Sequence, residues 1–176
     1  MYLLVLLFAF IILVITFFQL SNEAKLRKKK HLSKFRHAQL YVISYKSGKE
    51  FTEDAFPLIR AENVIGRKDA LSNADIKIST NDLTLSRNAA RLVFYDDSFV
   101  LLRLKGQKRI WIKTKDGKVY LLCPPASPLK DGETVGFGAA SYETVENGAF
   151  KLESGDTLLM GNTFFKYVEE GSKTNG

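Results

Sequence analysis

Residues 90–104 read ARLVFYDDSFVLLRL, two apolar runs on either side of the acidic pair Asp96 and Asp97. Runs of this length, rich in Val, Leu and Phe and separated by two turn-forming residues, predict a β-hairpin with strands over Ala90–Phe94 and Phe99–Leu104. The acidic pair is therefore interpreted as a turn and not as a pair of catalytic carboxylates.

The same pattern recurs outward from this hairpin, in short apolar or β-branched runs separated by Gly, Asn and Asp. No segment after the first 38 residues keeps an apolar stripe at helical spacing over three turns. About eleven short strands in some 130 residues predict an all-β fold, an antiparallel β-sandwich. The other strands are predicted over Leu40–Tyr45, Phe56–Ile59, Asn63–Ile65, Asp75–Ile78, Ile110–Thr114, Val119–Cys123, Phe150–Leu152, Thr157–Met160 and Thr163–Val168.

The net charge of +7 is concentrated at one end of the 176-residue chain. The first 36 residues contribute +6 of it, because they hold seven of the 26 basic residues and Glu23 alone among the 19 acidic ones. The remaining sequence carries a net charge of +1. The positive net charge of the whole chain thus comes mainly from a terminal segment. It does not indicate a nucleic-acid partner for the folded domain.

Residues 1–20 are predicted to form a transmembrane signal anchor. Tyr2–Phe18 reads YLLVLLFAFIILVITFF, without a charge and with Thr16 as its one weakly polar residue, which is close to the length needed to cross a bilayer. The alternative is a cleaved signal peptide, but the charged start, short apolar core and small-residue cleavage site are missing. Basic residues follow the run, so the positive-inside rule places the rest of the chain in the cytoplasm, at the cell membrane.

Residues 21–38 form a basic juxtamembrane neck. Its simplest role is to stop transfer and set orientation, and the alternative is attraction to anionic lipid headgroups. The neck also contains both histidines of the chain, His31 and His37.

The composition of the remaining chain excludes several kinds of chemistry. With no histidine after residue 37 and the single cysteine Cys123, neither the usual zinc spacings nor a Ser-His-Asp or Cys-His nucleophile arrangement occurs. Neither a dinucleotide-binding loop nor a phosphate-binding loop is present. We therefore expect no catalytic residues, no metal, no cofactor and no small-molecule substrate, and we expect the protein not to be an enzyme.

Three separated patches carry a more specific signal. They are Ile65-Gly66-Arg67, then Asn73–Ile78 followed by Leu85–Leu92 (LSRNAARL), and finally Val145–Gly161, which ends in LESGDTLLMG. In order and spacing they resemble the forkhead-associated (FHA) domain, of the bacterial type with an N-terminal anchor. The resemblance covers residues 39–170 and implies an eleven-stranded sandwich and recognition of threonine-phosphorylated proteins or peptides.

The residues in these patches suit that ligand. A phosphothreonine offers nearly two negative charges and three acceptor oxygens, which a guanidinium and a hydroxyl on adjacent loops can satisfy. The resemblance gives this role to Arg67 and Ser86, with Arg87 adding a contact. The alternative is that the arginines are strand-end residues paired with Asp69 or Asp82. The full candidate set is Arg67, Ser86, Arg87, Asn88, Lys105, Lys108 and Arg109.

Two departures from the family pattern weigh against a fully competent phosphate-binding site. Ala89 stands where the family has a histidine that braces the loop, so the loop carrying Ser86 must be held in another way or be looser. The asparagine that grips the peptide backbone is absent from Leu104–Ile110 (LKGQKRI). Lys105, Lys108 and Arg109 add positive charge there instead. A phosphorylation-independent scaffold with a degenerate FHA-like domain therefore remains an alternative to a phosphothreonine adaptor in Ser/Thr kinase signalling.

The segment near residues 113–140 is longer than the family core requires. It is expected to contain an extra hairpin and a proline-rich arm, CPPASP at residues 123–128. The arm is either a structural decoration or a docking ribbon for a protein partner. The polar tail, residues 171–176, is expected to be disordered.

Overall fold

The computed structural model describes residues 37–123, 129, 133–145 and 148–169. The predicted anchor, nearly all of the basic neck, the prolines of the arm and the C-terminal tail lie outside these residues. Among the described residues, no helix is long and apolar enough to span a bilayer.

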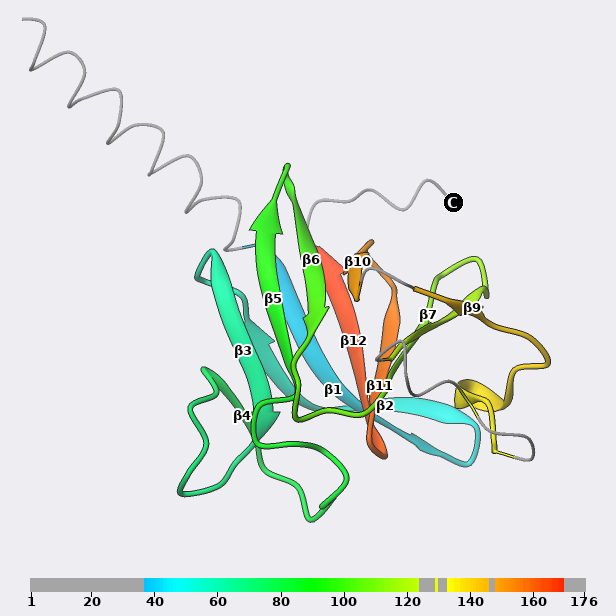
Figure 1. Ribbon diagram of the computed structural model, residues 1–176, viewed down its shortest axis with the longest axis horizontal. Coiled ribbons are helices and arrows are strands. Elements are labelled where there is room, and N and C mark those ends of the chain that lie inside the picture. Colours follow the sequence, from blue (N-terminus) through cyan, green and yellow to red (C-terminus); the bar gives the residue numbers. More distant parts are fainter. Residues whose placement is uncertain (1–36, 124–128, 130–132, 146–147, 170–176) are drawn as a thin grey trace, which may run out of the picture.

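Twelve strands and one short 3-10 helix make up the described chain (Figure 1). They are β1 Ala38–Lys46, β2 Lys49–Pro57, β3 Glu62–Arg67, β4 Ile76–Ile78, β5 Ala90–Tyr95, β6 Ser98–Arg103, β7 Ile110–Lys113, β8 Val119–Leu122, η1 Gly136–Gly138, β9 Glu143–Thr144, β10 Ala149–Lys151, β11 Thr157–Met160 and β12 Thr163–Glu169.

The strands form two sheets, of which one has the order β2-β1-β12-β11-β7-β8-β9 and the other β10-β6-β5-β3-β4. In Figure 1, β5 and β6 pass in front of β1 and β12. The main core lies between the sheets, because alternate residues of both point inward. Examples are Leu40 and Val42 of β1, Phe165 and Tyr167 of β12 and Leu92 of β5, all buried in one cluster.

The hairpin predicted over residues 90–104 is confirmed. Antiparallel β5 and β6 pair from Ala90 with Arg103 to Tyr95 with Ser98. Asp96 and Asp97 form the turn with φ values of 48° and 61°, the left-handed conformation that a two-residue hairpin turn of this class requires. Aspartate tolerates that conformation better than most residues do, which explains an acidic pair here without any catalytic role.

The prediction of about eleven antiparallel strands is corrected in two respects. The described residues form twelve strands, and both sheets are mixed, because β3 pairs in parallel with β4 and β8 in parallel with β9. The strand predicted at Phe56–Ile59 is wrong in extent, since β2 covers Lys49–Pro57 along β1. β2 is an edge strand whose side chains are nearly all exposed, so it has no apolar run by which its sequence would be recognised.

A second, smaller core lies on the outer face of the larger sheet. Trp111 of β7 packs there with Val119, Leu121 and Cys123, and residues 135–142 cover them. The Trp111 ring meets that of Tyr142 edge to face, with centroids 5.3 Å apart. The described part of the long segment after β8 is therefore packed against the sheet.

We expect Gly136→Ala to loosen this cover. A Cβ at residue 136 would lie 2.3 Å from Cγ of Trp111, so the segment must move away, at a cost of about 1–3 kcal/mol. Trp111 is the only tryptophan, so its fluorescence emission should shift to the red as water reaches the ring. Ser141→Ala, an exposed change in the same segment, is the control; an unshifted spectrum in Gly136→Ala would contradict the prediction.

Candidate functional site

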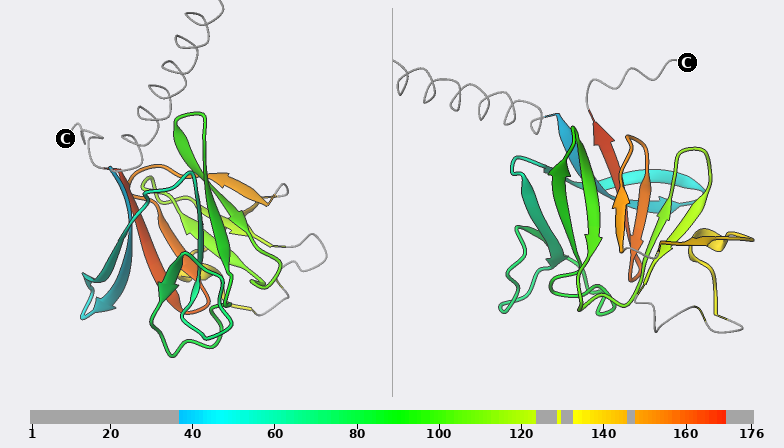
Figure 2. Two further views of the ribbon diagram at one scale, coloured as in Figure 1. Left: turned by 90° about the vertical axis from the view of Figure 1, so that its left-hand side faces the viewer. Right: turned by 45° about the horizontal axis from the view of Figure 1, so that its top comes forward.

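Four connections gather at one end of the two sheets: the β3–β4, β4–β5 and β6–β7 loops and the β11–β12 turn. Figures 1 and 2 place them opposite the end where β1 begins and β12 finishes. All the predicted site residues belong to this end, since Arg67 closes β3 and the others lie in the β4–β5 and β6–β7 loops. The structure therefore brings together residues from separate sequence patches.

Backbone contacts fix the β4–β5 loop against the end of β3. The amide of Arg67 donates to the carbonyl of Ser86 at 3.0 Å, and the amide of Ala89 donates to the carbonyl of Ile65 at 2.8 Å. Between them, a Cβ at Gly66 would lie 1.8 Å from the carbonyl oxygen of Arg87. Glycine at residue 66 thus permits the close approach that sets Ser86 beside Arg67.

Two buried polar side chains hold the loop, although the side chain of Ala89 can make no hydrogen bond. Oε1 of Gln107 accepts the Ser86 amide at 3.0 Å, and the hydroxyl of Ser72 donates to the carbonyl of Arg87 at 2.9 Å. Gln107 is 4% exposed, and its Nε2 also donates to the carbonyl of Arg109 at 3.2 Å. Gln107 therefore points inward as a brace.

The Ser86 hydroxyl donates to the carbonyl of Gly106 at 2.6 Å. This bond joins the β4–β5 loop to the β6–β7 loop at the edge of a cavity of about 440 Å³. The cavity is lined by Leu83, Thr84, Ser86, Gly106, Gln107, Lys108, Arg109, Trp111 and Gly161. The Ser86 hydroxyl has one hydrogen to donate. A ligand oxygen that accepts a hydrogen bond from it must therefore take the place of the Gly106 carbonyl as acceptor.

Arg67 and Arg87 converge on one carboxylate, that of Asp69. Oδ2 of Asp69 lies 3.6 Å from Nη2 of Arg67 and 3.1 Å from Nε of Arg87. The Leu71 amide and then Arg87 hold the pKa of the Asp69 carboxyl below its ordinary value. Nη1 of Arg67 is buried and has no acceptor among the described residues. The ion pair that the alternative interpretation anticipated is thus present, and it leaves a donor of Arg67 unsatisfied.

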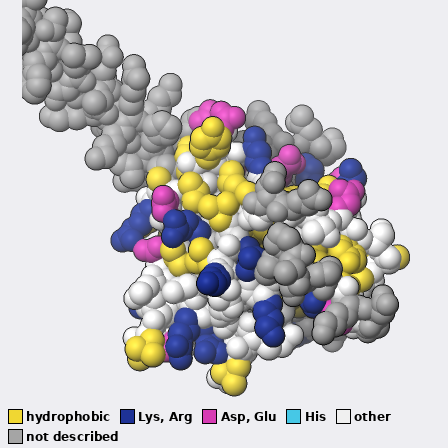
Figure 3. Space-filling model, viewed as in Figure 1, with side chains coloured by type: hydrophobic (Ala, Val, Ile, Leu, Met, Phe, Trp, Pro, Cys, Tyr) yellow, Lys and Arg dark blue, Asp and Glu magenta, His cyan; other side chains and the backbone are white. Residues whose placement is uncertain are grey.

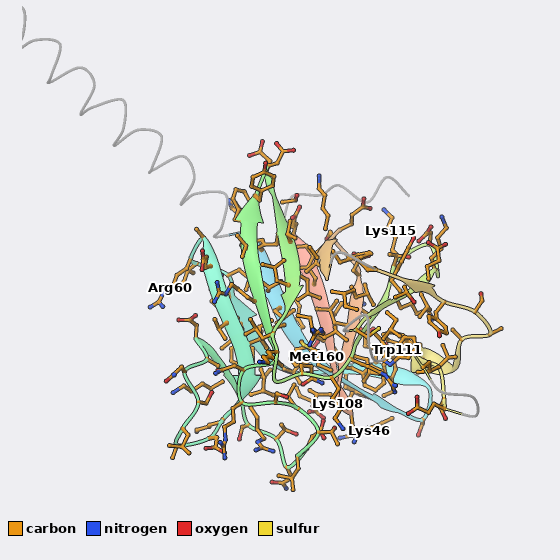
Figure 4. The ribbon with its side chains drawn as sticks, viewed as in Figure 1. Lys46, Arg60, Lys108, Trp111, Lys115 and Met160 are labelled. Carbon is orange, nitrogen blue, oxygen red and sulfur yellow. The ribbon has the colours of Figure 1, made fainter. Side chains whose placement is uncertain are left out.

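The other predicted residues lie nearby but differ in their surroundings. Asn88 has a buried Oδ1 without a donor in the described part of the chain. Lys105 and Lys108 are exposed, whereas Arg109 is paired with Glu133 at 2.8 Å. In Figure 4, Lys108 and Trp111 lie at this end, and Lys115 lies away from it. Lys105 and Lys108 are therefore the more accessible of the added cations.

Exposed apolar residues flank the charges. Leu71 on the β3–β4 loop is 71% exposed and Leu83 on the β4–β5 loop is 81% exposed. Figure 3 shows Lys and Arg side chains over the lower part of the molecule, with hydrophobic groups at its lower edge, where these loops lie. The surface can thus contact both an anionic group and apolar side chains of one ligand.

Asp82 ties the β4–β5 loop to the opposite sheet. Its Oδ2 accepts the Asn162 amide at 2.7 Å and the Thr163 hydroxyl at 3.2 Å, both in the β11–β12 turn region, while Oδ1 accepts the Thr84 amide at 2.9 Å. Burial acts to raise the pKa of Asp82, but the bonds from Thr84, Asn162 and Thr163 outweigh it and the pKa is lowered. The carboxylate form is therefore the one that holds the loop.

Sequence reasoning missed several residues of the site. Gln107 and Ser72 each lack a local pattern that would mark them as braces, and Glu133 lies far along the chain from its partner Arg109. Asp69 and Asp82 were considered only as partners of the arginines, and the structure gives that role to Asp69 alone.

We expect Gln107→Leu to destabilise the protein by about 1–3 kcal/mol, because it leaves the buried Ser86 amide without an acceptor. Hydrogen exchange of that amide should also become faster. Denaturant unfolding and amide exchange measure the two effects. Lys108→Leu, an exposed change on the same loop, is the control, and unaltered exchange at Ser86 in Gln107→Leu would disprove the bracing role.

We expect Asp82→Asn to destabilise the protein by about 1–3 kcal/mol at pH 7, because the amide cannot accept all of the bonds that the carboxylate accepts. Since the folded pKa is below the unfolded one, the stabilisation is present above the unfolded value of about 3.9 and is lost as pH falls through the folded pKa. The difference from wild type should therefore shrink towards pH 3 in denaturant unfolding. Asp54→Asn, an exposed charge on β2, controls for charge loss; a difference independent of pH would contradict the assignment.

No protein-family model and no curated protein sequence matches this chain. Among solved structures it is similar to the FHA domain of a Chlamydia trachomatis protein, at 16% identity over 76% of this chain and 98% of that one, with a TM-score of 0.43. It is also similar to full-length yeast Pml1p, at 13% identity over 74% and 80%, with a TM-score of 0.46.

A third similar structure is EmbR of Mycobacterium tuberculosis in complex with a low-affinity phosphopeptide, at 19% identity and a TM-score of 0.44. The match covers 77% of this chain and 25% of EmbR, so it concerns about a quarter of that protein. Each of these TM-scores lies below 0.5, and the function proposed below rests on the residues of this chain.

Proposed function

We propose that this chain is a membrane-anchored adaptor that binds threonine-phosphorylated proteins, without catalysing a reaction. The observation that carries the proposal is the meeting of Arg67, Ser86 and Arg87 at one end of the sandwich, in the order that resembles an FHA domain. Two guanidiniums and a hydroxyl supply the charge and the donors that a phosphate requires.

The unsatisfied donor of Arg67 supports this function. A buried guanidinium nitrogen without an acceptor costs about 1–3 kcal/mol, and an incoming phosphate that draws the Arg67 side chain towards itself removes part of that cost. The same ligand accepts the hydrogen bond of the Ser86 hydroxyl in place of the Gly106 carbonyl. Both changes are small side-chain movements, of Arg67 at the end of β3 and of Ser86 on a loop that Gln107, Ser72 and Gly66 keep in place.

The surroundings of the phosphate suit an extended peptide. The cavity beside Ser86 is bordered by Leu83 and Trp111 as well as by Lys108, so a peptide side chain next to the phosphothreonine has an apolar wall and a positive charge within reach. The family's asparagine is absent, and Gln107 is committed to Ser86. We therefore propose weaker control over the peptide backbone and less sequence preference than a complete FHA site would give.

The proposed anchor does not conflict with access to the site. β1 begins and β12 ends at the end of the sheets opposite the site loops (Figure 2). A chain tethered to a membrane through its first residues could present these loops away from the attachment point. The proposed setting is the cytoplasmic side of the cell membrane, in Ser/Thr kinase signalling linked to envelope growth or division.

A phosphorylation-independent scaffold is the second candidate. The observation that favours it is the engagement of the site residues with one another, because Asp69 pairs with both arginines and the Ser86 hydroxyl is bonded to Gly106. A scaffold would use Leu71 and Leu83 in the same way whether or not its partner carries phosphate.

We expect the full-length chain to bind a degenerate phosphothreonine peptide library and not the same library without phosphate. Arg67→Ala should weaken binding at least about 30-fold, since losing one side of a close charge pair costs about 2 kcal/mol or more. Isothermal titration or fluorescence polarisation measures both affinities. Arg60→Ala is the matched control, because Arg60 is exposed and pairs with Asp75. Binding that is indifferent to phosphate and to Arg67→Ala would support the scaffold instead.

A further inference from the structure

Asp69 occupies the place in the site where an anionic ligand is expected. One of its carboxylate oxygens, Oδ2, faces both Arg67 and Arg87, at 3.6 Å and 3.1 Å. Like charges on two neighbouring guanidiniums repel, and a carboxylate between them offsets that repulsion. The carboxylate therefore supplies to the arginines in the unliganded protein what a phosphate would supply in the complex.

The β3–β4 loop itself holds Asp69 in this position. Oδ1 accepts the Leu71 amide at 3.0 Å, and the Asp69 carbonyl accepts the Ser72 amide at 3.1 Å. Ser72 in turn donates its hydroxyl to the carbonyl of Arg87. The carboxylate is thus fixed by contacts that do not involve the arginine side chains, and it stays near them when a ligand arrives.

We propose that Asp69 lowers the affinity of the site for every anion, so that a dianionic phosphate still binds measurably and a peptide carboxylate does not. This inference rests on the proposed function. A peptide glutamate or aspartate carries one negative charge and two acceptor oxygens, so its gain from the two arginines is small and is offset by its repulsion from Asp69. A phosphate brings nearly two charges and three acceptor oxygens, and it gains from both arginines even with Asp69 close by.

The repulsion between Asp69 and the bound phosphate has a second consequence. Affinity for the phosphopeptide is lower than the two arginines and the serine alone would give. Asp69 thus lowers affinity for every anion, and it excludes the singly charged ones because their gain from the arginines is smaller. In the opposite role, Asp69 would orient the arginines for the ligand. Removing its charge would then weaken phosphopeptide binding instead of strengthening it.

The test compares the full-length wild type with Asp69→Asn, which keeps an oxygen acceptor for the Leu71 amide but removes the charge. Two peptides are titrated, one with phosphothreonine and one with glutamate at the same position. We expect Asp69→Asn to bind the phosphopeptide about tenfold more tightly and to bind the glutamate peptide measurably, unlike wild type. Asp116→Asn, an equal charge change on the β7–β8 turn, is the control and should match wild type.

Each other outcome has a defined meaning. If wild type binds the phosphopeptide and Asp69→Asn binds it equally or more weakly, the inference about Asp69 is overturned and the proposed function stands. If neither protein binds either peptide, the proposed function fails and the inference fails with it. Asp69→Ser, whose hydroxyl can also accept the Leu71 amide, guards against a folding defect; unfolding of both neutral variants would overturn the inference by making the charge a structural requirement.

Discussion

The close approach of two backbones at Gly66 is the constraint on which the candidate site depends. Since a Cβ there would lie 1.8 Å from the carbonyl oxygen of Arg87, only glycine lets the β4–β5 loop lie against the C-terminal end of β3. The hydrogen bonds from Arg67 to Ser86 and from Ala89 to Ile65 form on either side of this contact. A larger residue at 66 would separate the arginine from the serine before it disturbed the hydrophobic core.

Gly161 imposes a similar constraint from the other sheet. Its φ is +64°, and a Cβ there would lie 2.4 Å from Oγ1 of Thr84 and 2.7 Å from Oδ2 of Asp82. The loop that carries Ser86 is thus held between a glycine of the smaller sheet and a glycine in the β11–β12 turn of the larger one. The loop geometry therefore depends on the packing of the two sheets, and the site forms only when the sandwich has closed.

The sequence predicted those parts of the fold that local chemistry determines. The hairpin over residues 90–104 was recognisable because both its apolar runs and its acidic turn lie in one short stretch. β2 was not, because an exposed edge strand has no apolar alternation, and neither was β9, which has two residues and pairs with β8 across a long connection. In the site, Arg67, Ser86 and Arg87 stand in motifs, so they could be named in advance. The brace at Gln107 and the bonds of Asp82 to Asn162 and Thr163 join distant parts of the chain, and no local pattern encodes them.

The folded part is nearly neutral, and at the site this neutrality arises from acidic residues that pair with the arginines. Asp69 balances Arg67 and Arg87, and Glu133 balances Arg109, so these three arginines do not add to an uncompensated patch. A polyanion such as nucleic acid binds through the neutralisation of many phosphates by many free cations, which these pairs do not offer. A single phosphate has a different advantage, because it brings nearly two charges and three acceptor oxygens to one point beside both arginines. On the proposed function, the pairing of the arginines with acidic residues therefore weakens the binding of every anion, and measurable binding is left to a dianion that reaches both guanidiniums at once.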